Sequence, residues 1–162
     1  MHWGLAVSSD LVHWQERDIA LFADENGTMF SGSAVVDYRD ATGLKQNEND
    51  VILLFYTCAG NTSEVSQGKP FTQNLAYSTD GGESFVKYAG NPLIPQLAFE
   101  NRDPKVFYHA PTDRYIMALF LEGHEFALFG SENMLEWTEL SRLSLPEDWE
   151  CPDLYPLMVD GE

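Results

Sequence analysis

Two acidic residues, Asp103 and Glu150, stand where short apolar segments of the chain begin. Asp103 follows Arg102 and precedes a proline in ENRDPKVFYH (100–109), and Glu150 opens ECPDLYPL (150–157). Two carboxyl groups that face one concave site can cleave a glycosidic bond, because one protonates the leaving oxygen and the other stabilises or attacks the oxocarbenium-like centre. We expect Arg102 to keep Asp103 ionised, and the aromatic and apolar neighbours of Glu150 to favour its use as a proton donor.

A polar segment that recurs three times indicates which fold could bring these groups together. Each copy has a serine, an Asp or Asn two residues later and then an aromatic residue. The copies are SSDLVHW (8–14), STDGGESF (78–85) and SENMLEW (131–137). This pattern is typical of hairpin turns, in which we expect Asp10, Asp80 and Asn133 to bond the turn backbone. The aromatic residues that end the copies are predicted to lie in the core: Trp14, Phe85 and Trp137.

Apolar stretches with strand character lie between these turns. They are FSGSAVVDY (30–38), VILLFYT (51–57), DPKVFYH (103–109) and RYIMALFL (114–121). Together with the hairpins they form a unit of four short antiparallel strands, and this unit occurs twice in full. Such a repeat is the signature of β-propeller blades. We therefore predict an all-β fold with about two and a half blades. The predicted parts are the outer strands of one blade (1–21), two full blades (29–95 and 102–143) and the start of the next blade (150–162).

The propeller geometry would place the two carboxyl groups in one site. The first strand of every blade lines the central axis, so the residues that begin successive first strands meet at one mouth of the channel. Asp103 and Glu150 hold such positions, and the equivalent position one blade earlier is held by Ser31, Gly32 and Ser33. Because a propeller normally closes into a ring, we also expect a chain that ends inside one to expose strand edges, and either to self-associate through them or to be only marginally stable.

The composition limits the class of partner. The net charge is −17 at pH 7, with only nine Lys and Arg, so nucleic acid and anionic membrane surfaces are excluded and a neutral ligand is favoured. We expect no membrane span, and no export signal in MHWGLAVSSD (1–10). Cys58 and Cys151 are too few for a disulfide framework, and the four His show no metal-ligand spacing. The redox compartment and the cellular location stay open.

Five segments of the chain resemble glycoside hydrolase family 32, the β-fructofuranosidases that include invertase, levanase and exo-inulinase. They are MHWGLAVSSDLVHW (1–14), FSGSAVV (30–36), QNLAYSTDGG (73–82), RDPKVF (102–107) and WECPDLYPL (149–157). The resemblance implies a five-bladed propeller that hydrolyses terminal β-fructofuranosides with retention, through a covalent fructosyl intermediate. Glycosidase chemistry by two carboxyl groups needs only protons and water, so we expect no metal or organic cofactor.

The resemblance also implies roles for single residues. Asp103 matches the aspartate that hydrogen-bonds fructose hydroxyls and stabilises the transition state, and Glu150 matches the general acid/base. Arg102 matches the neighbour of that aspartate, while Phe30 and Ser31 match residues of the fructose pocket. We expect Cys151 to belong to the same substrate site, as a small packing residue that tunes Glu150.

The chain departs from the family pattern at three places. The family's aspartate nucleophile lies in a W-M-N-D-P-N-type motif upstream of the segment at 1–14, and we expect this chain to lack it. Leu5 stands where His is common, and Asn101 stands where an aromatic residue precedes RDP. The second of these substitutions is expected to alter the pocket or the substrate.

Other interpretations remain open on the sequence alone. Arg102 with Asp103 could form a salt bridge at a strand start, and Glu150 could be a solvated charge in the acidic stretch PEDWE (146–150). The chain could be a non-catalytic carbohydrate-binding or structural propeller fragment. STDGGESF (78–85) also fits the Asp-box of sialidase propellers, although a sialidase needs an arginine cluster. Sucrose, inulin, levan and a phosphorylated sucrose are not distinguished as substrates.

Overall fold

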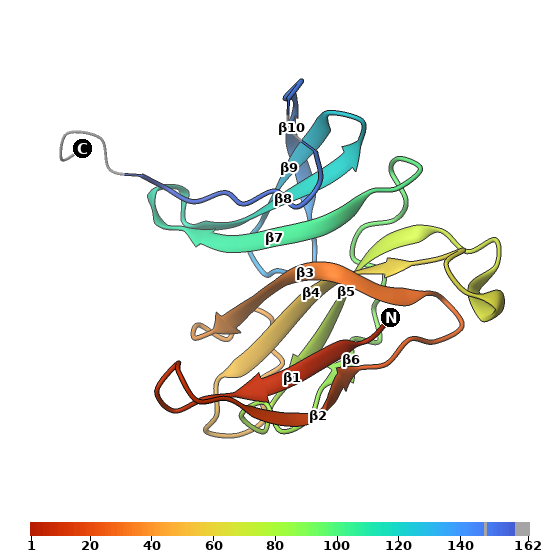
Figure 1. Ribbon diagram of the computed structural model, residues 1–162. Coiled ribbons are helices and arrows are strands. Elements are labelled where there is room, and N and C mark those ends of the chain that lie inside the picture. The colour runs from red at the N-terminus through yellow and green to blue at the C-terminus, as the bar shows by residue number, and fades with distance from the viewer. Residues whose placement is uncertain (148, 158–162) are drawn as a thin grey trace.

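The computed structural model describes residues 1–147 and 149–157, and the regular secondary structure of this part of the chain is almost entirely β-strand (Figure 1). The strands are β1 (Trp3–Val7), β2 (Gln15–Leu21), β3 (Thr28–Asp37), β4 (Val51–Ala59), β5 (Phe71–Ser78), β6 (Val86–Lys87), β7 (Arg102–His109), β8 (Arg114–Glu122), β9 (Glu125–Ser131) and β10 (Thr138–Ser144). Two 3-10 turns, η1 (Glu64–Ser66) and η2 (Ala110–Thr112), interrupt them. The all-β prediction is confirmed. In the described ranges, no helix has the length and apolar character needed to cross a membrane.

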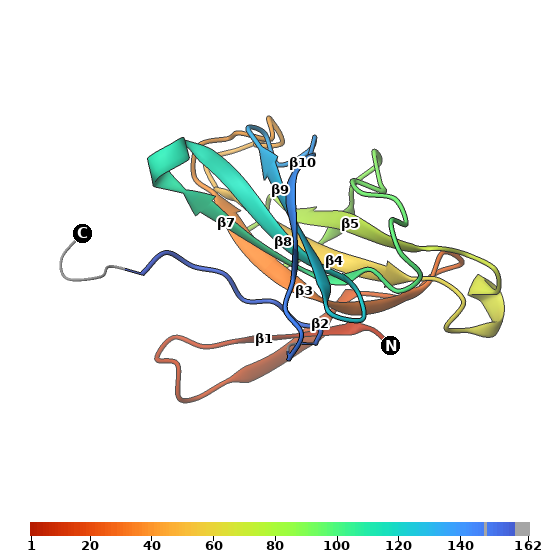
Figure 2. The same ribbon diagram turned by 90° about the horizontal axis from the view of Figure 1, so that it is seen from above.

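The strands form three antiparallel sheets that follow the order of the chain. One sheet pairs β1 with β2, the second has the order β3-β4-β5-β6, and the third has the order β7-β8-β9-β10. The two four-stranded sheets meet where their first strands, β3 and β7, lie side by side (Figures 1 and 2). A side chain joins them there: Ser33 Oγ donates to the Pro104 carbonyl at 2.8 Å and accepts the Val106 N–H at 2.9 Å.

The repeated polar segments form the turns that the sequence predicts. Asp10 Oδ1 accepts the backbone N–H of His13 at 2.8 Å, and Asp80 Oδ1 accepts that of Ser84 at 3.1 Å. Asn133 Oδ1 does the same for Glu136 at 2.9 Å. Each side chain therefore satisfies turn backbone that the strands leave unpaired, which is the usual reason for Asp and Asn at such positions.

The main core lies between the two four-stranded sheets. Phe55 of β4 packs edge to face on Trp137, with ring centroids 6.0 Å apart, and Met117 of β8 is fully buried in the same cluster. A smaller cluster, which includes Tyr56 and receives Phe85, lies on the side of β1 and β2. The core positions of Phe85 and Trp137 are thus as predicted.

The prediction for Trp14 is wrong, because this side chain is 57% exposed. Trp14 ends the turn of the two-stranded sheet, and in the described residues no third strand joins that sheet. The other two turns belong to four-stranded sheets that pack against a neighbour, so their aromatic residues find a surface to cover.

β3 contains a bulge close to its start. The register with β4 shifts between Met29 and Gly32, so Phe30 and Ser31 lie in the irregular stretch. At this point the two backbones approach so closely that a Cβ on Gly32 would overlap the carbonyl oxygen of Phe55. A glycine is therefore needed here, as is common where a bulge brings two backbones together.

Replacing Gly32 by alanine is expected to lower the free energy of unfolding by about 3 kcal/mol, because β3 and β4 must move apart to admit the methyl group. Gly4→Ala in β1 is the matched control, since nothing lies within 4 Å of a Cβ at that position. Urea unfolding of the two variants and the parent chain measures the difference. Equal stability of the two variants would contradict the close approach of β3 and β4.

The segment that follows β10 returns to β7. In residues 149–157 no strand is formed, and Asp153 is tied to β7 by an ion pair with Lys105 at 2.9 Å. The blade predicted to start in 150–162 falls partly on residues 158–162, which lie outside the described residues. The division of the chain into blades stays a prediction.

Candidate active site

β7 begins with a bulge that turns Asp103 inward. Arg102 pairs with Phe120 of β8, the next paired residue is Lys105, and Asp103 and Pro104 lie between them. The backbone of Asp103 has a φ of 63°, in the left-handed region that is uncommon for residues other than glycine. Bulges of this kind re-aim a side chain and occur often beside active sites. Here the bulge leaves Asp103 only 6% exposed.

Arg102 links the start of β7 to the segment after β10. Its Nε and Nη2 donate to Glu150 Oε2 at 3.0 and 2.8 Å. Its Nη1 donates to the carboxylate and the carbonyl of Glu100, both at 3.0 Å, and the guanidinium stacks on the Phe120 ring 4.5 Å from the centroid. Arg102 Nε also lies 3.7 Å from Asp103 Oδ2. One guanidinium nitrogen thus has both predicted catalytic carboxylates as neighbours.

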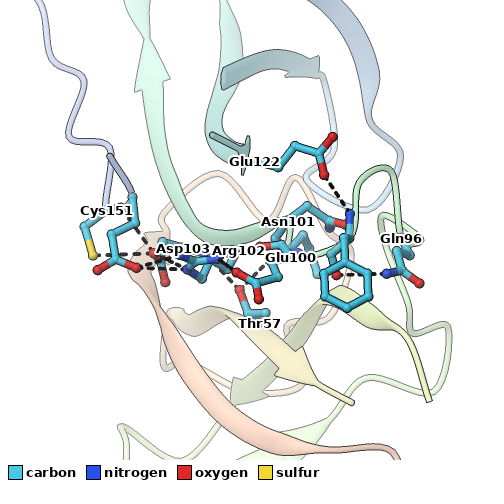
Figure 3. Close-up of polar contacts among 11 residues, drawn as sticks. Thr57, Gln96, Glu100, Asn101, Arg102, Asp103, Glu122 and Cys151 are labelled. Carbon is cyan, nitrogen blue, oxygen red and sulfur yellow. Dashed lines mark hydrogen bonds and ion pairs between the residues drawn. The ribbon is translucent and has the colours of Figure 1, made fainter. Parts of the chain in front are cut away.

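Cys151 donates two hydrogen bonds to Asp103, and both reach the carboxylate oxygen that lies near Arg102 (Figure 3). Asp103 Oδ2 accepts the backbone N–H of Cys151 at 3.2 Å and the thiol at 3.4 Å. Cys151, like Asp103, has a left-handed backbone, with a φ of 57°. The Cys151 N–H therefore donates to the Asp103 carboxylate, while the side chain of the preceding residue, Glu150, accepts hydrogen bonds from Arg102.

Burial raises the pKa of Asp103, because the charged carboxylate loses solvation in its enclosed position. The two hydrogen bonds from Cys151 and the charge of Arg102 oppose this effect without cancelling it. Arg102 thus favours the ionised form of Asp103, as expected, but desolvation has the larger effect on the pKa of this group. Burial also raises the pKa of the Cys151 thiol, as does the nearby Asp103, so the thiol keeps its proton and can donate it to the carboxylate.

The raised pKa of Asp103 predicts how stability depends on pH. A carboxyl group whose pKa is raised on folding adds stability below its unfolded value of about 3.9, and this contribution is lost as pH rises through the folded value. An asparagine side chain cannot titrate, so Asp103→Asn should gain stability relative to the parent chain between about pH 3.5 and pH 7. Urea unfolding at both pH values measures the change. If the stability of Asp103→Asn relative to the parent chain stays constant or falls between these pH values, the pKa of Asp103 is not raised by burial.

Glu150 is less enclosed than the sequence suggests. Its side chain is 52% exposed, and the neighbouring Trp149 is 70% exposed. Glu150 nevertheless lines a cavity of about 320 Å³ together with Trp149, Cys151 and Pro152, and the other walls of this cavity are mostly apolar. The expected apolar neighbours are therefore present, although the Glu150 side chain stays half exposed. The Trp149 ring contacts His124, with ring centroids 5.5 Å apart. The Cys151 thiol contacts Asp103, where an influence on Glu150 was expected.

The structure brings together four of the six predicted site residues: Arg102, Asp103, Glu150 and Cys151. Phe30 and Ser31 lie on the neighbouring strand β3, where Phe30 packs edge to face on Phe71 with ring centroids 5.7 Å apart. In the described part of the chain, no hydrogen bond joins Ser31 to either carboxylate. The link between β3 and β7 is made instead by Ser33, two residues further along the strand.

Sequence reasoning missed two residues of this site. The Glu100 carboxylate accepts a hydrogen bond from Nη1 of the Arg102 guanidinium. Its position two residues before Arg102 in ENRDP could have indicated this contact. Thr57 of β4 accepts the Asp103 N–H at 2.9 Å from a different sheet, and no local pattern indicates this contact.

The electrostatics of the cluster suit a ligand that is neutral or becomes positively charged. Three carboxylates, from Glu100, Asp103 and Glu150, surround one arginine, so negative charge is in excess. Such a cluster can stabilise an oxocarbenium-like centre, while the exposed Glu150 can exchange its proton with a bound group. Within residues 1–147 and 149–157, no group of three His, Cys, Asp or Glu side chains is placed to hold a metal ion.

Comparison with known proteins gives one family. The sequence model of the N-terminal domain of glycosyl hydrolases family 32 matches residues 1–162. A levanase of Bacillus subtilis (strain 168) is 40% identical over 99% of this chain and 24% of its own length. An invertase of Schizosaccharomyces pombe is 37% identical over 99% of this chain and 29% of its own length.

Solved structures give the same result. A β-fructofuranosidase from Schwanniomyces occidentalis, complexed with fructosyl-erythritol, superposes with a TM-score of 0.78 at 36% identity, over 88% of this chain and 28% of its own. An exo-inulinase from Aspergillus awamori gives a TM-score of 0.78 at 29% identity, over 89% of this chain and 32% of its own. The predicted fold, part of a five-bladed β-propeller, is thereby confirmed. The chain spans about a quarter to a third of these relatives.

Proposed function

The chain belongs to glycosyl hydrolase family 32, and from this premise we propose that it forms part of the active site of a retaining β-fructofuranosidase. The reaction is hydrolysis of terminal β-D-fructofuranosides by two carboxyl groups. The observation that carries the proposal is the position of the Arg102 guanidinium, which contacts both Asp103 and Glu150 although the two acids come from separate segments of the chain.

Each acid has a different role in this proposal. Glu150 is the general acid/base, because its side chain is half exposed and can meet both a leaving group and a water molecule. Asp103 is the transition-state stabiliser, because its carboxylate accepts two hydrogen bonds from Cys151 and can offer its negative charge to the positive charge that develops on the fructosyl group. Arg102 orients both acids, and Phe30, Ser31 and Cys151 belong to the fructose-binding surface.

The proposed reaction has two steps. In the first, Glu150 donates its proton to the glycosidic oxygen, the bond to the fructosyl carbon breaks, and that carbon bonds to the aspartate nucleophile of the family's upstream motif. In the second, Glu150 takes a proton from water, and the resulting attack releases fructose and frees the nucleophile. Protons and water complete this balance, so the proposal needs no cofactor.

The proposed ligand is a neutral saccharide that contains fructose. One solved relative carries fructosyl-erythritol and another, from the same organism, carries fructosylnystose. The net charge of −17 also favours a neutral ligand over an anionic one. Sucrose, inulin and levan all fit this description.

Fructose release tests the proposal. It is measured with residues 1–162 alone and with the completed enzyme, defined as the Bacillus subtilis levanase in which residues 1–162 replace the matching region. We expect release from sucrose, inulin or levan by the completed enzyme, and little or none by residues 1–162 alone. A completed enzyme that binds fructose without turnover would favour the second candidate, a carbohydrate-binding propeller segment. This candidate is kept because the chain spans only 24% of the length of the levanase.

A further inference from the structure

Two buried side chains of the neighbouring sheet hold the backbone on both sides of Arg102. Thr57 of β4 accepts the Asp103 N–H at 2.9 Å and donates its own proton to Gln73 Oε1 at 2.7 Å. Gln73 of β5 then donates through Nε2 to the Asn101 carbonyl at 2.8 Å. Thr57 and Gln73 face each other in the β4–β5 ladder, and both are fully buried. Figure 3 shows Thr57 next to Asp103.

This pair has little freedom to rearrange. A threonine hydroxyl has one proton, and since Thr57 gives it to Gln73, only its lone pairs face the Asp103 N–H. Gln73 is fixed as well, because its own backbone bonds Leu93 and Ile94 at 2.9 to 3.2 Å. The two side chains therefore act as a rigid clamp, which we call the Thr57–Gln73 clamp.

The contact matters because Asp103 has no partner in the ladder. The register skips from Arg102 to Lys105, so the bulge leaves the Asp103 N–H without a strand neighbour. A left-handed backbone costs energy for residues other than glycine, although aspartate tolerates it better than most, and contacts with the surroundings help to maintain it. The direction of the Asp103 side chain depends on this backbone conformation, so the hydrogen bond from Asp103 to Thr57 also sets where the carboxylate points.

We propose that Thr57 and Gln73 are positioning residues, which fix the direction of the Asp103 carboxylate from the adjacent sheet. The inference rests on the role proposed above for Asp103 and adds residues to that site. Neither side chain reaches the open face of the site, since both are fully buried, so they act through Asp103 and do not touch the substrate.

Three variants separate positioning from a general contribution to stability. Thr57→Val keeps the shape and removes the hydroxyl, and Thr57→Ser restores the hydroxyl. Thr42→Val is the matched control, because Thr42 is also buried and its hydroxyl donates to Asp37 at 2.8 Å, away from the site. Each variant is made in residues 1–162 for amide hydrogen exchange and in the completed enzyme for fructose release from sucrose.

We expect Thr57→Val to lose protection of the Asp103 amide and to lower kcat by about tenfold to a hundredfold, with KM changed less than about threefold. Thr57→Ser should retain both properties, and Thr42→Val should leave both unchanged although it loses a similar hydrogen bond. The inference is overturned if Thr57→Val and Thr42→Val have equal kcat, or if the Asp103 amide of the parent chain exchanges as fast as in Thr57→Val.

Failure of the proposed function gives a different result. In that case the parent completed enzyme releases no fructose, while amide exchange in residues 1–162 still reports on the clamp. Loss of Asp103 protection in Thr57→Val alone then supports the clamp as the device that orients this carboxylate. Unchanged protection in that variant overturns it.

Discussion

Replacing Glu150 by glutamine in the completed enzyme is expected to lower kcat for fructose release from sucrose by about 10²- to 10⁴-fold. Glutamine has nearly the same shape and can still accept a hydrogen bond from Arg102, but it has no proton to give to the leaving oxygen. Glu147→Gln is the matched control, because it removes the same charge from the same acidic stretch, PEDWE. The measurement is the initial rate at saturating sucrose.

The leaving group provides a second reading of the same variant. Fluoride departs without protonation, so Glu150→Gln should slow the first step much less with β-D-fructofuranosyl fluoride than with sucrose. The rate of this step is measured as a burst of released fluoride. Equal losses on both substrates would show that Glu150 does not act as the acid. Near-normal turnover of sucrose would remove it from the mechanism.

Asp103→Asn is expected to lower kcat/KM for fructose release by about 10²- to 10³-fold. The amide keeps an oxygen that can accept the bonds from Cys151, so the shape of the site is preserved while its negative charge is lost. Because burial raises the pKa of Asp103, its ionised form costs stability at neutral pH, and the variant should be no less stable than the parent there. An activity loss together with unimpaired stability is the mark of a functional residue.

The control for this variant is Asp113→Asn in the turn between β7 and β8. Asp113 pairs with Arg39 at 2.8 Å on an exposed surface, so its loss removes one acid and one ion pair without touching the site. We expect turnover close to that of the parent. Retained kcat/KM in Asp103→Asn, or an equal loss in both variants, would mean that the charge of Asp103 does not stabilise the transition state.

The fold was predictable from the sequence where the signals are local. The Ser-x-Asp turns at Asp10 and Asp80 bond their own backbone, so a few neighbouring residues determine them. Strand order followed because successive strands pair with their neighbours in the chain. The exposure of Trp14 was not predictable in this way, since it depends on how many strands the first sheet contains.

The candidate site was predictable only in part, for the same reason. The positions of Asp103 and Glu150 at segment starts indicated that they could meet, and Arg102 joins them in the structure. The burial of Asp103 depends on a bulge and a left-handed backbone that no residue pattern states. The contacts of Asp103 with Thr57 and Cys151 join residues from different parts of the chain, so they become visible only when the sheets are packed.

A double-mutant cycle on Asp103 and Glu150 tests most directly whether the two acids work as one site. The measurement is kcat/KM for fructose release by the completed enzyme, by Asp103→Asn, by Glu150→Gln and by the double variant. We predict that the double variant is about as slow as the slower single variant, because residues that act as a unit give strongly non-additive losses. Losses that multiply in full would contradict a shared site at the hub of the propeller.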